Sequence, residues 1–246
     1  MLCNDIGCII TRMKDLIRQT IWASGAQGVV VGISGGIDSA VAAAVAAKAL
    51  GSEHVLGVHF PLESRCSLDL ADIKELCDRF GIELLIIPLK NVLYTAFSNP
   101  YMTSNPMLCG NYTARLRMAT LYNIAAARNR LVCGTSNKTE YLLGYYTKWG
   151  DSAADIQPLL HLWKKDVYKI AWDIGIPQSI IEKVPSAGFW DGQSDEEEIG
   201  FSYQELDSAL VSLEEHAFVP QNTLEEQVLA VVNKNFHKRG SVASLL

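Results

Sequence analysis

The most informative run of this chain reads Val29-Val30-Val31-Gly32-Ile33-Ser34-Gly35-Gly36-Ile37-Asp38-Ser39-Ala40. The β-branched residues at its start predict a buried strand. Residues 40–50, almost all alanine, valine and lysine, predict the helix that follows. Between the two, adjacent glycines let successive backbone N–H groups point at one spot. Together with the N-terminus of the helix, they predict an anion cradle.

Polar side chains within this run add to the cradle. The hydroxyls of Ser34 and Ser39 are further donors, and the Asp38 carboxylate needs a metal ion to be reconciled with a bound phosphate. The structural alternative is a tight turn that merely requires glycine, with Asp38 as a capping residue. The flanking strand and helix favour the anion site.

Three known motifs compete for these residues. Gly32 to Gly36 matches the G-x-S-x-G nucleophile elbow of hydrolases, and histidines lie downstream. The P-loop of kinases and GTPases is excluded, because no lysine followed by serine or threonine closes the loop. The third motif, Ser-Gly-Gly-x-Asp-Ser, fits Ser34 to Ser39 at every position and resembles the loop of the N-type ATP pyrophosphatases. We prefer this interpretation, in which the loop holds the β- and γ-phosphates of ATP while the α-phosphorus is attacked.

Bulk composition narrows the class of protein. The chain has 246 residues, enough for one substantial core, so we expect a single domain over residues 1–246. A net charge of −6 argues against a general nucleic-acid surface. The six cysteines form no Cys-x-x-Cys pair and are interpreted as reduced packing residues. Without a signal peptide or a run of ~18 apolar residues, we expect a cytoplasmic protein with neither nucleic acid nor a membrane as partner.

Outside the glycine-rich run, apolar strands alternate with helices. The pattern predicts strands at 55–60, 83–87 and 131–133, and helices at 5–23, 68–80, 112–129, 164–173, 203–215 and 223–236. This spacing predicts an α/β fold, a parallel sheet with right-handed crossovers and helices on both faces. Such sheets bind ligands beyond the carboxyl ends of their strands, which is where Ser34-Gly35-Gly36 lies.

Three segments lack helical or strand periodicity. Residues 98–109 are polar and contain prolines, so we expect a mobile loop there. Residues 144–158 are rich in charged and aromatic side chains, and residues 185–195 also predict a loop. Ser136 and Asn137, which follow a predicted strand, are both good N-caps for a helix.

Four further stretches accompany the glycine-rich loop in one family that this chain resembles, the ammonia-dependent NAD synthetases. They are Gly110 to Met118, Gly134 to Glu140, Gly144 to Asp151 with Asp155, and Pro185 to Trp190 followed by Gln193 to Glu196. His237-Lys238-Arg239 fits as well, so the resemblance covers about residues 5–240. It implies a Rossmann-like sheet of the adenine nucleotide alpha hydrolase type.

The resemblance also implies a ligase reaction in two steps. ATP adenylates the nicotinate carboxylate of deamido-NAD and releases pyrophosphate, and ammonia then displaces AMP to give NAD. Because two anions must be joined, catalysis would depend on electrostatics and positioning. Mg²⁺ is the implied cofactor, with Asp38 and Glu140 as its carboxylate ligands. The structural alternative for Glu140 is a solvated position on a helix face.

By the same resemblance, one set of residues binds ATP: Gly32, Ile33, Ser34, Gly35, Gly36, Ile37, Asp38, Ser39, Thr135, Lys164 and Ser186. The family often has threonine where this chain has Ser186. Lys164 would contact the phosphates and would be catalytic together with Asp38. Its alternative is plain surface charge at the start of a helix.

A second set would hold deamido-NAD: Arg115, Lys148, Asp155, His237 and Lys238. Cations suit a ligand that carries a pyrophosphate and a carboxylate, and the Asp155 carboxylate suits ribose hydroxyls. Arg117 cannot share one helix face with Arg115 and could be structural.

The second step needs a residue that orients or deprotonates ammonium. Asp151 is the best catalytic candidate to orient or deprotonate ammonium, and a turn aspartate after Gly150 is its alternative. The aromatic residues nearby could stack on the pyridine ring or belong to the core; they are Tyr145, Tyr146 and Trp149.

The nearest alternative function is another N-type ATP pyrophosphatase. A tRNA-thiolating enzyme would carry catalytic cysteines and a basic RNA face, and a GMP synthetase-like enzyme has no reason to carry Gly110 to Met118. A non-catalytic nucleotide-binding module would keep the loop but not Asp38, Glu140 and Lys164 together.

The length of the chain before the first strand bears on the nitrogen donor, and the family resemblance bears on the oligomeric state. The residues before Val29 are too few for an amidase (glutaminase) domain, so we expect free or delivered ammonia as the donor. The family resemblance implies a homodimer whose dinucleotide site forms across the two-fold interface. Its predicted contacts are the N-terminal helix and the helix at 112–129.

Overall fold

The computed structural model describes residues 5–61, 66–186 and 192–240. Within them, a parallel sheet has the strand order β3-β2-β1-β4. Its strands are β1 (Val29–Gly32), β2 (Val55–His59), β3 (Glu83–Ile86) and β4 (Leu131–Cys133). In the register of the sheet, Val30 pairs with Leu56 on one side and with Val132 on the other. The predicted α/β fold with a parallel sheet is confirmed.

Helices cover both faces of this sheet. One face packs against α1 (Ile6–Ser24), α2 (Ile37–Leu50), α3 (Cys66–Phe80) and α7 (Lys164–Ile174), and the other against α4 (Lys90–Phe97) and α5 (Pro106–Ala127). Because side chains alternate along a strand, Val29 and Val31 join the first core and Val30 joins the second. Each core is therefore built from β-branched strand residues and the apolar face of its helices.

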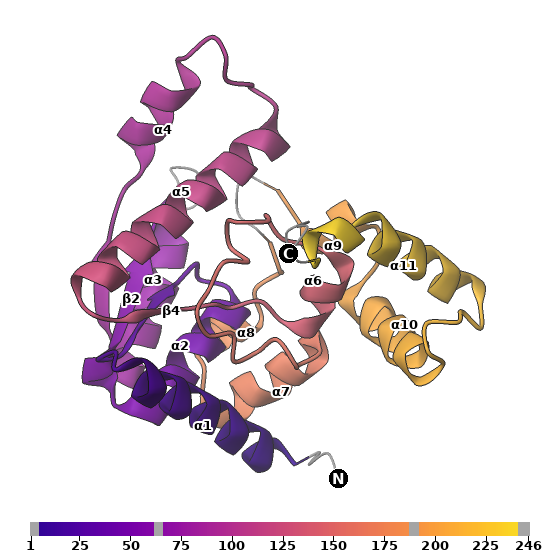
Figure 1. The fold of residues 1–246 in the computed structure, drawn as a ribbon, viewed down its shortest axis with the longest axis horizontal. Helices are drawn as coiled ribbons and strands as arrows, with labels where there is room; N and C mark the ends of the chain where they lie inside the picture. Colours follow the sequence, from indigo (N-terminus) through magenta and orange to yellow (C-terminus); the bar gives the residue numbers. More distant parts are fainter. Residues whose placement is uncertain (1–4, 62–65, 187–191, 241–246) are drawn as a thin grey trace, which may run out of the picture.

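The last third of the chain adds a separate helical cluster. It is formed by α6 (Lys138–Leu143), α10 (Tyr203–Glu215) and α11 (Thr223–Lys234), with Leu206 and Leu210 fully buried. Figure 1 shows α10 and α11 beside α6, away from the sheet. The short elements are α8 (Gln178–Ile181), α9 (Asp195–Ile199), η1 (Ser52–His54) and η3 (Phe236–Lys238). Among the described helices, none is long and apolar enough to cross a membrane.

The segment from 90 to 111 differs from its prediction. Helix α4 was not predicted, and α5 begins at Pro106, inside the expected loop at 98–109. The cause is local, since the Asn105 side chain accepts a hydrogen bond from the N–H of Leu108 and proline occupies the first turn. This N-cap signal starts the helix well before the apolar pattern does.

A buried carboxylate fastens the helical cluster to the sheet domain. Asp207 on α10 is 2% exposed. It accepts hydrogen bonds from the hydroxyl of Thr139 at 2.5 Å and from the backbone N–H of Lys165 at 2.8 Å. The hydroxyl oxygen of Thr139 in turn accepts from the backbone N–H of Lys164 at 3.0 Å. One side chain thus orients α6, α7 and α10 relative to one another.

Replacing Asp207 with alanine tests this connection. Asp207→Ala leaves two buried donors without their acceptor, and each such group costs roughly 1–3 kcal/mol, so we expect a loss of about 2–6 kcal/mol in the free energy of unfolding. Chemical denaturation followed by circular dichroism measures it. The control is Ser208→Ala, an exposed neighbour whose hydroxyl bonds only within its own helix. An equal effect of the two substitutions would contradict the assignment.

Candidate active site

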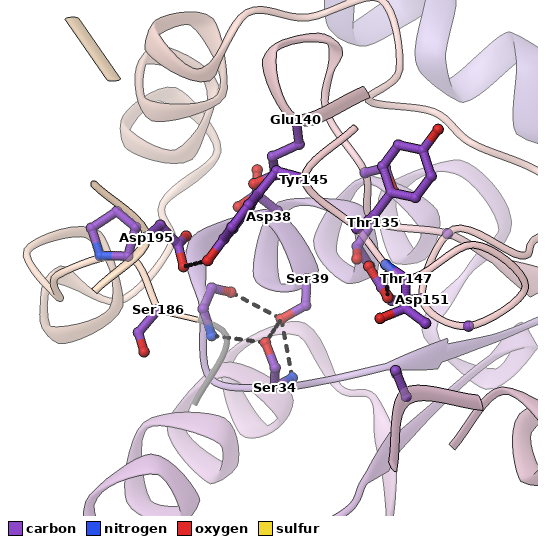
Figure 2. A pocket seen from close by; sticks show the side chains of 18 of the residues that line it. Ser34, Asp38, Ser39, Thr135, Glu140, Tyr145, Thr147, Asp151, Ser186 and Asp195 are labelled. Atoms are coloured by element: carbon purple, nitrogen blue, oxygen red, sulfur yellow. Dashed lines mark hydrogen bonds between the residues drawn. The ribbon is translucent and has the colours of Figure 1, made fainter. Parts of the chain in front are cut away.

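A cavity of about 780 Å³ lies beyond the carboxyl ends of the strands (Figure 2). Its floor is the segment that follows β1, and its walls are the segments that follow β2 and β4 together with residues 144–151. Residues 32–39, every one predicted to bind ATP, line it. The cavity therefore lies where the strand pattern predicted a ligand site.

The segment from Ser34 to Ser39 closes into a small hydrogen-bonded ring, drawn with dashed lines in Figure 2. The hydroxyl of Ser39 donates to the carbonyl of Gly36 at 2.9 Å and accepts from the N–H of Ser34 at 3.2 Å. The N–H of Gly36 donates to the hydroxyl of Ser34 at 3.2 Å. Gly35 has a φ of +86°, a conformation that glycine adopts without steric cost.

The helix that follows this ring starts without a side-chain cap. Gly36 is the N-cap of α2, and it has no side chain to accept from the first N–H groups of the helix. These N–H groups and the positive end of the helix dipole favour an anion at the cavity floor. This geometry agrees with the predicted phosphate cradle.

A buried ammonium group lies beside the cradle. The Nζ of Lys164 is 2.6 Å from Oδ2 of Asp38 and 3.1 Å from Oε1 of Glu140, and its side chain is 3% exposed. It also lies 4.6 Å from the centre of the Tyr203 ring. The structural alternatives, a surface lysine and a solvated Glu140, are therefore wrong.

The pKa values in this triad follow from burial and charge. Burial alone would lower the pKa of Lys164, but the carboxylates of Asp38 and Glu140 outweigh it and raise the pKa. Burial raises the pKa of Glu140 to about 7, against the opposing charge of Lys164 and with the help of Asp38. Glu140 is thus a carboxyl group that changes its charge near neutral pH.

The donor set also bears on a metal ion. Asp38 and Glu140 both point at one cationic group, so their oxygens converge on one region of the cavity wall. Over the residues that the structure describes, no group of three or more His, Cys, Asp or Glu side chains could hold a metal ion. Mg²⁺ needs no such group, because it binds through one or two carboxylates and completes its shell with phosphate oxygens and water. The residues present fit Mg²⁺ in company with a phosphate ligand.

The remaining predicted ATP residues also line the cavity. Thr135 follows β4, and Ser186 follows Pro185 on the opposite wall. Residues 187–191, within the loop expected at 185–195, lie outside the described residues.

The residues predicted to hold deamido-NAD fall in three places. Arg115 on α5 donates through Nε and Nη2 to the carbonyl of Lys148, and Nζ of Lys148 donates to the carbonyl of His237 at 2.9 Å. Lys238 lines the cavity and donates to the carbonyls of Gly144 and Tyr146. The structure thus brings Arg115, Lys148 and His237 together, with Lys238 adjacent in sequence.

Asp155 lies apart from that group. Its carboxylate accepts from the backbone N–H of Val132 at 2.8 Å and from the hydroxyl of Tyr122 at 3.4 Å. It is therefore engaged with strand β4 and helix α5, and it is not among the residues that line the cavity.

Asp151 is a carboxyl group of the cavity wall, on a residue that is exposed to solvent overall. Its Oδ1 accepts from the N–H of Thr147 at 2.9 Å, and burial raises its pKa. Arg117 lines the same cavity, donates to the carbonyl of Phe60 and has its pKa lowered to about 10 by burial, against the attraction of Asp151. Arg117, and not Arg115, is the α5 arginine whose side chain reaches this cavity.

A second carboxyl group in the wall was quoted in the sequence without a role. Asp195, 6% exposed, accepts from the hydroxyls of Tyr145 and Tyr203, both at 3.1 Å. The single hydroxyl proton of Tyr145 is shared between Asp195 and Glu198, whose Oε2 is 2.5 Å from the hydroxyl oxygen, and the ring packs against the helical cluster. Tyr145 is thus tied into the wall by its hydroxyl, which no spacing pattern could indicate.

His59 is a cavity residue that the sequence analysis missed. It lies at the end of β2, 6% exposed, and its Nδ1 is 2.9 Å from the carbonyl of Ile33. Burial lowers its pKa, so the neutral ring donates from Nδ1 to that carbonyl. The only available signal was a polar residue at the end of an apolar run.

Comparison with known proteins identifies the family. The family model described as NAD synthase matches residues 9–241. The NH3-dependent NAD+ synthetase of Methanoregula boonei is 46% identical over 245 residues, covering 100% of this chain and 99% of the relative. The NH3-dependent NAD+ synthetase of Pyrococcus furiosus is 42% identical, covering 94% of this chain and 91% of the relative.

Solved structures agree with the sequence relatives. The NMN synthetase of Francisella tularensis has a TM-score of 0.89 at 33% identity, covering 98% of this chain and 99% of the other. The NH3-dependent NAD synthetase of Campylobacter jejuni, in complex with a nitrate ion, has a TM-score of 0.85 at 31% identity, covering 99% and 100%. The chain therefore belongs to the NAD synthase family.

Proposed function

We propose that this enzyme uses ATP to amidate deamido-NAD with ammonia, giving NAD, AMP and pyrophosphate. The observation that carries the proposal is the cavity floor, where the uncapped N-terminus of α2 and the Lys164–Asp38–Glu140 triad meet in a chain of this family. The assay that tests it mixes the protein with ATP, Mg²⁺, deamido-NAD and an ammonium salt, and follows NAD. Because the Francisella neighbour is an NMN synthetase, the same assay also tests nicotinate mononucleotide as a carboxylate substrate in competition with deamido-NAD.

In the first step, a nicotinate carboxylate oxygen attacks the α-phosphorus of ATP. The bond between that phosphorus and the oxygen that leads to the β-phosphate breaks, and pyrophosphate leaves. The N–H groups of the first turn of α2, from Ile37 to Ser39, would hold the β- and γ-phosphates, and Thr135 and Ser186 would donate hydroxyls to ATP. Lys164 supplies positive charge beside the phosphates, where repulsion between the two substrates is greatest.

Asp38 and Glu140 would hold Mg²⁺ in this state. When bound, Mg²⁺ neutralises phosphate charge and orients the triphosphate. Both carboxylates already face one ammonium group, which supports their role as a pair that collects positive charge.

In the second step, ammonia attacks the carbonyl carbon of the acyl-adenylate and AMP leaves. Ammonium must lose a proton to become the nucleophile, and Asp151 is our candidate to hold ammonium and accept that proton. Its raised pKa and its place in the cavity wall support this role, because a raised pKa makes a carboxylate a better base.

The dinucleotide would lie along Arg115, Lys148, Asp155, His237 and Lys238. Their contacts lead from the cavity toward the surface of α5, so we propose that a second copy of the chain completes this site in a homodimer. A large apolar side chain is exposed on the N-terminal helix predicted to form part of the contact, Trp22 on α1, which is 86% exposed.

The proposed role of the loop carboxylate can be tested by removing its charge. Asp38→Asn removes one of the two charges that face Lys164, and we expect kcat for pyrophosphate release to fall by about 100-fold or more, the usual loss for a preorganised electrostatic contact. A coupled pyrophosphate assay measures it. Asp15→Asn on the exposed side of α1 is the control, and wild-type turnover in Asp38→Asn would refute the role.

The proposed deamido-NAD site can be tested by removing Arg115. Arg115→Ala is expected to raise KM for deamido-NAD by about 10-fold or more, as one lost charged contact would, and to leave KM for ATP nearly unchanged. Steady-state kinetics with each substrate varied in turn separates the two constants. Arg128→Ala, on an exposed arginine after the end of the same helix, is the matched control. Equal changes in both KM values would count against the assignment.

The raised pKa of Glu140 predicts how the activity depends on pH. An acid with a pKa of about 7 carries its charge only above that pH, so kcat/KM for ATP at saturating Mg²⁺ is expected to fall about tenfold per pH unit below neutrality. Glu140→Gln cannot titrate, so this step should vanish from its pH profile at a uniformly low rate. Persistence of the same step in Glu140→Gln would assign the titration to another group.

A further inference from the structure

Lys183 is a second lysine of the cavity to which neither the family motifs nor the proposed mechanism gives a role. It lies between α8 and Ser186, and its Nζ meets three acceptors. These are Oδ2 of Asp72 at 2.5 Å, Oδ1 of Asp69 at 2.9 Å and the carbonyl oxygen of Gly35 at 3.4 Å. An ammonium group has three N–H donors, so all of them are in use.

The third acceptor belongs to the phosphate cradle itself. Gly35 and Gly36 are adjacent, so steric clashes do little to keep the peptide unit between them from rotating. The two ends of a trans peptide unit point in opposite directions. With the Gly35 carbonyl directed to Lys183, the Gly36 N–H points back into the ring, where it donates to the hydroxyl of Ser34. If that unit turned over, it would present a carbonyl oxygen to an incoming phosphate.

We propose that Lys183 is a positioning residue that fixes the Gly35–Gly36 peptide in the orientation that keeps its carbonyl oxygen away from the phosphate site. The inference rests on the proposed function, because it assigns the orientation to the binding of the ATP phosphates. Asp69 and Asp72 on α3 hold the ammonium in place, so one cation joins the cradle, α3 and the segment that leads to Ser186.

Charge separates this role from that of a phosphate ligand. Lys183 has two carboxylate partners, and the three side chains together carry a net charge of −1. Such a group does not attract an anion, and it has no donor left to offer one. The side chains of Lys183, Asp69 and Asp72 are 27%, 24% and 16% exposed, so they are sheltered enough to hold a fixed geometry.

The test compares Lys183→Met with the wild type by isothermal titration of Mg–ATP and by steady-state kinetics. We expect Mg–ATP affinity to fall about 10- to 100-fold, the range for loss of a hydrogen bond to a charged group. KM for ATP should rise in parallel, and KM for deamido-NAD should stay within about twofold, as additivity at separate sites implies. Lys183→Arg keeps donors for the same acceptors and should restore most of the affinity. Lys169→Met, on an exposed lysine of α7, is the matched control.

The outcomes distinguish the two proposals. If the wild type binds no Mg–ATP, the proposed function fails and takes this inference with it. If the wild type binds and Lys183→Met binds equally well, only the inference is overturned. It is also overturned if Lys183→Met changes both KM values alike, because that is the signature of general structural damage. Should Lys183→Met not fold, Asp72→Asn carries the same test, with a smaller loss of ATP affinity expected and unchanged affinity overturning the inference.

Discussion

The buried ammonium group of Lys164 is the contact on which the architecture of the cavity depends. It comes from α7 and joins Asp38 at the start of α2 to Glu140 on α6. A buried ion pair is weak evidence for stability, but removing one partner leaves a charge that burial strongly disfavours. Here the cation has two partners, so without it two neighbouring carboxylates would repel each other at the cavity wall. The ion pairs of Lys164 thus join the sheet core to the helical cluster, and they lie where the proposed reaction needs charged groups.

Sheet topology explains why this meeting point lies at the cavity. β1 is in the middle of the sheet, with β2 on one side and β4 on the other, and the chain leaves β1 toward α2 on one face. It reaches β4 from α5 on the opposite face. The crevice beyond β1 and β4 is therefore a topological switch point, where open parallel sheets bind ligands. Ser34 to Ser39 follow one of these strands and Thr135 follows the other, so both reach the same space from opposite layers.

Much of this arrangement could be predicted from the sequence, for physical reasons. The β-branched run from Val29 to Val31 and the N-cap signal of Asn137 are local, so the strands and most helices were predictable. Helix α4 was not predicted. The early start of α5 was also missed, because the polar, proline-containing residues 98–109 suggested a loop and Asn105 was not recognised as an N-cap. The residues of the cradle were identified because their chemistry is contiguous in the chain. Asp195, His59 and Lys183 were not, because their partners are distant in sequence and only the tertiary fold brings them together.

Asn137 shows how closely folding and chemistry share atoms here. Its Oδ1 accepts from the backbone N–H of Glu140 and so starts α6, and its Nδ2 donates to Asp38 at 2.8 Å. Glu140 completes the capping box with one oxygen and holds Lys164 with the other. Aspartate would keep the cap but turn a second carboxylate toward Asp38, and serine or threonine would cap the helix without reaching as a donor. No other N-cap residue therefore serves both purposes, and the choice of amide over acid or alcohol at this position is dictated by the electrostatics of the cavity and not by helix initiation.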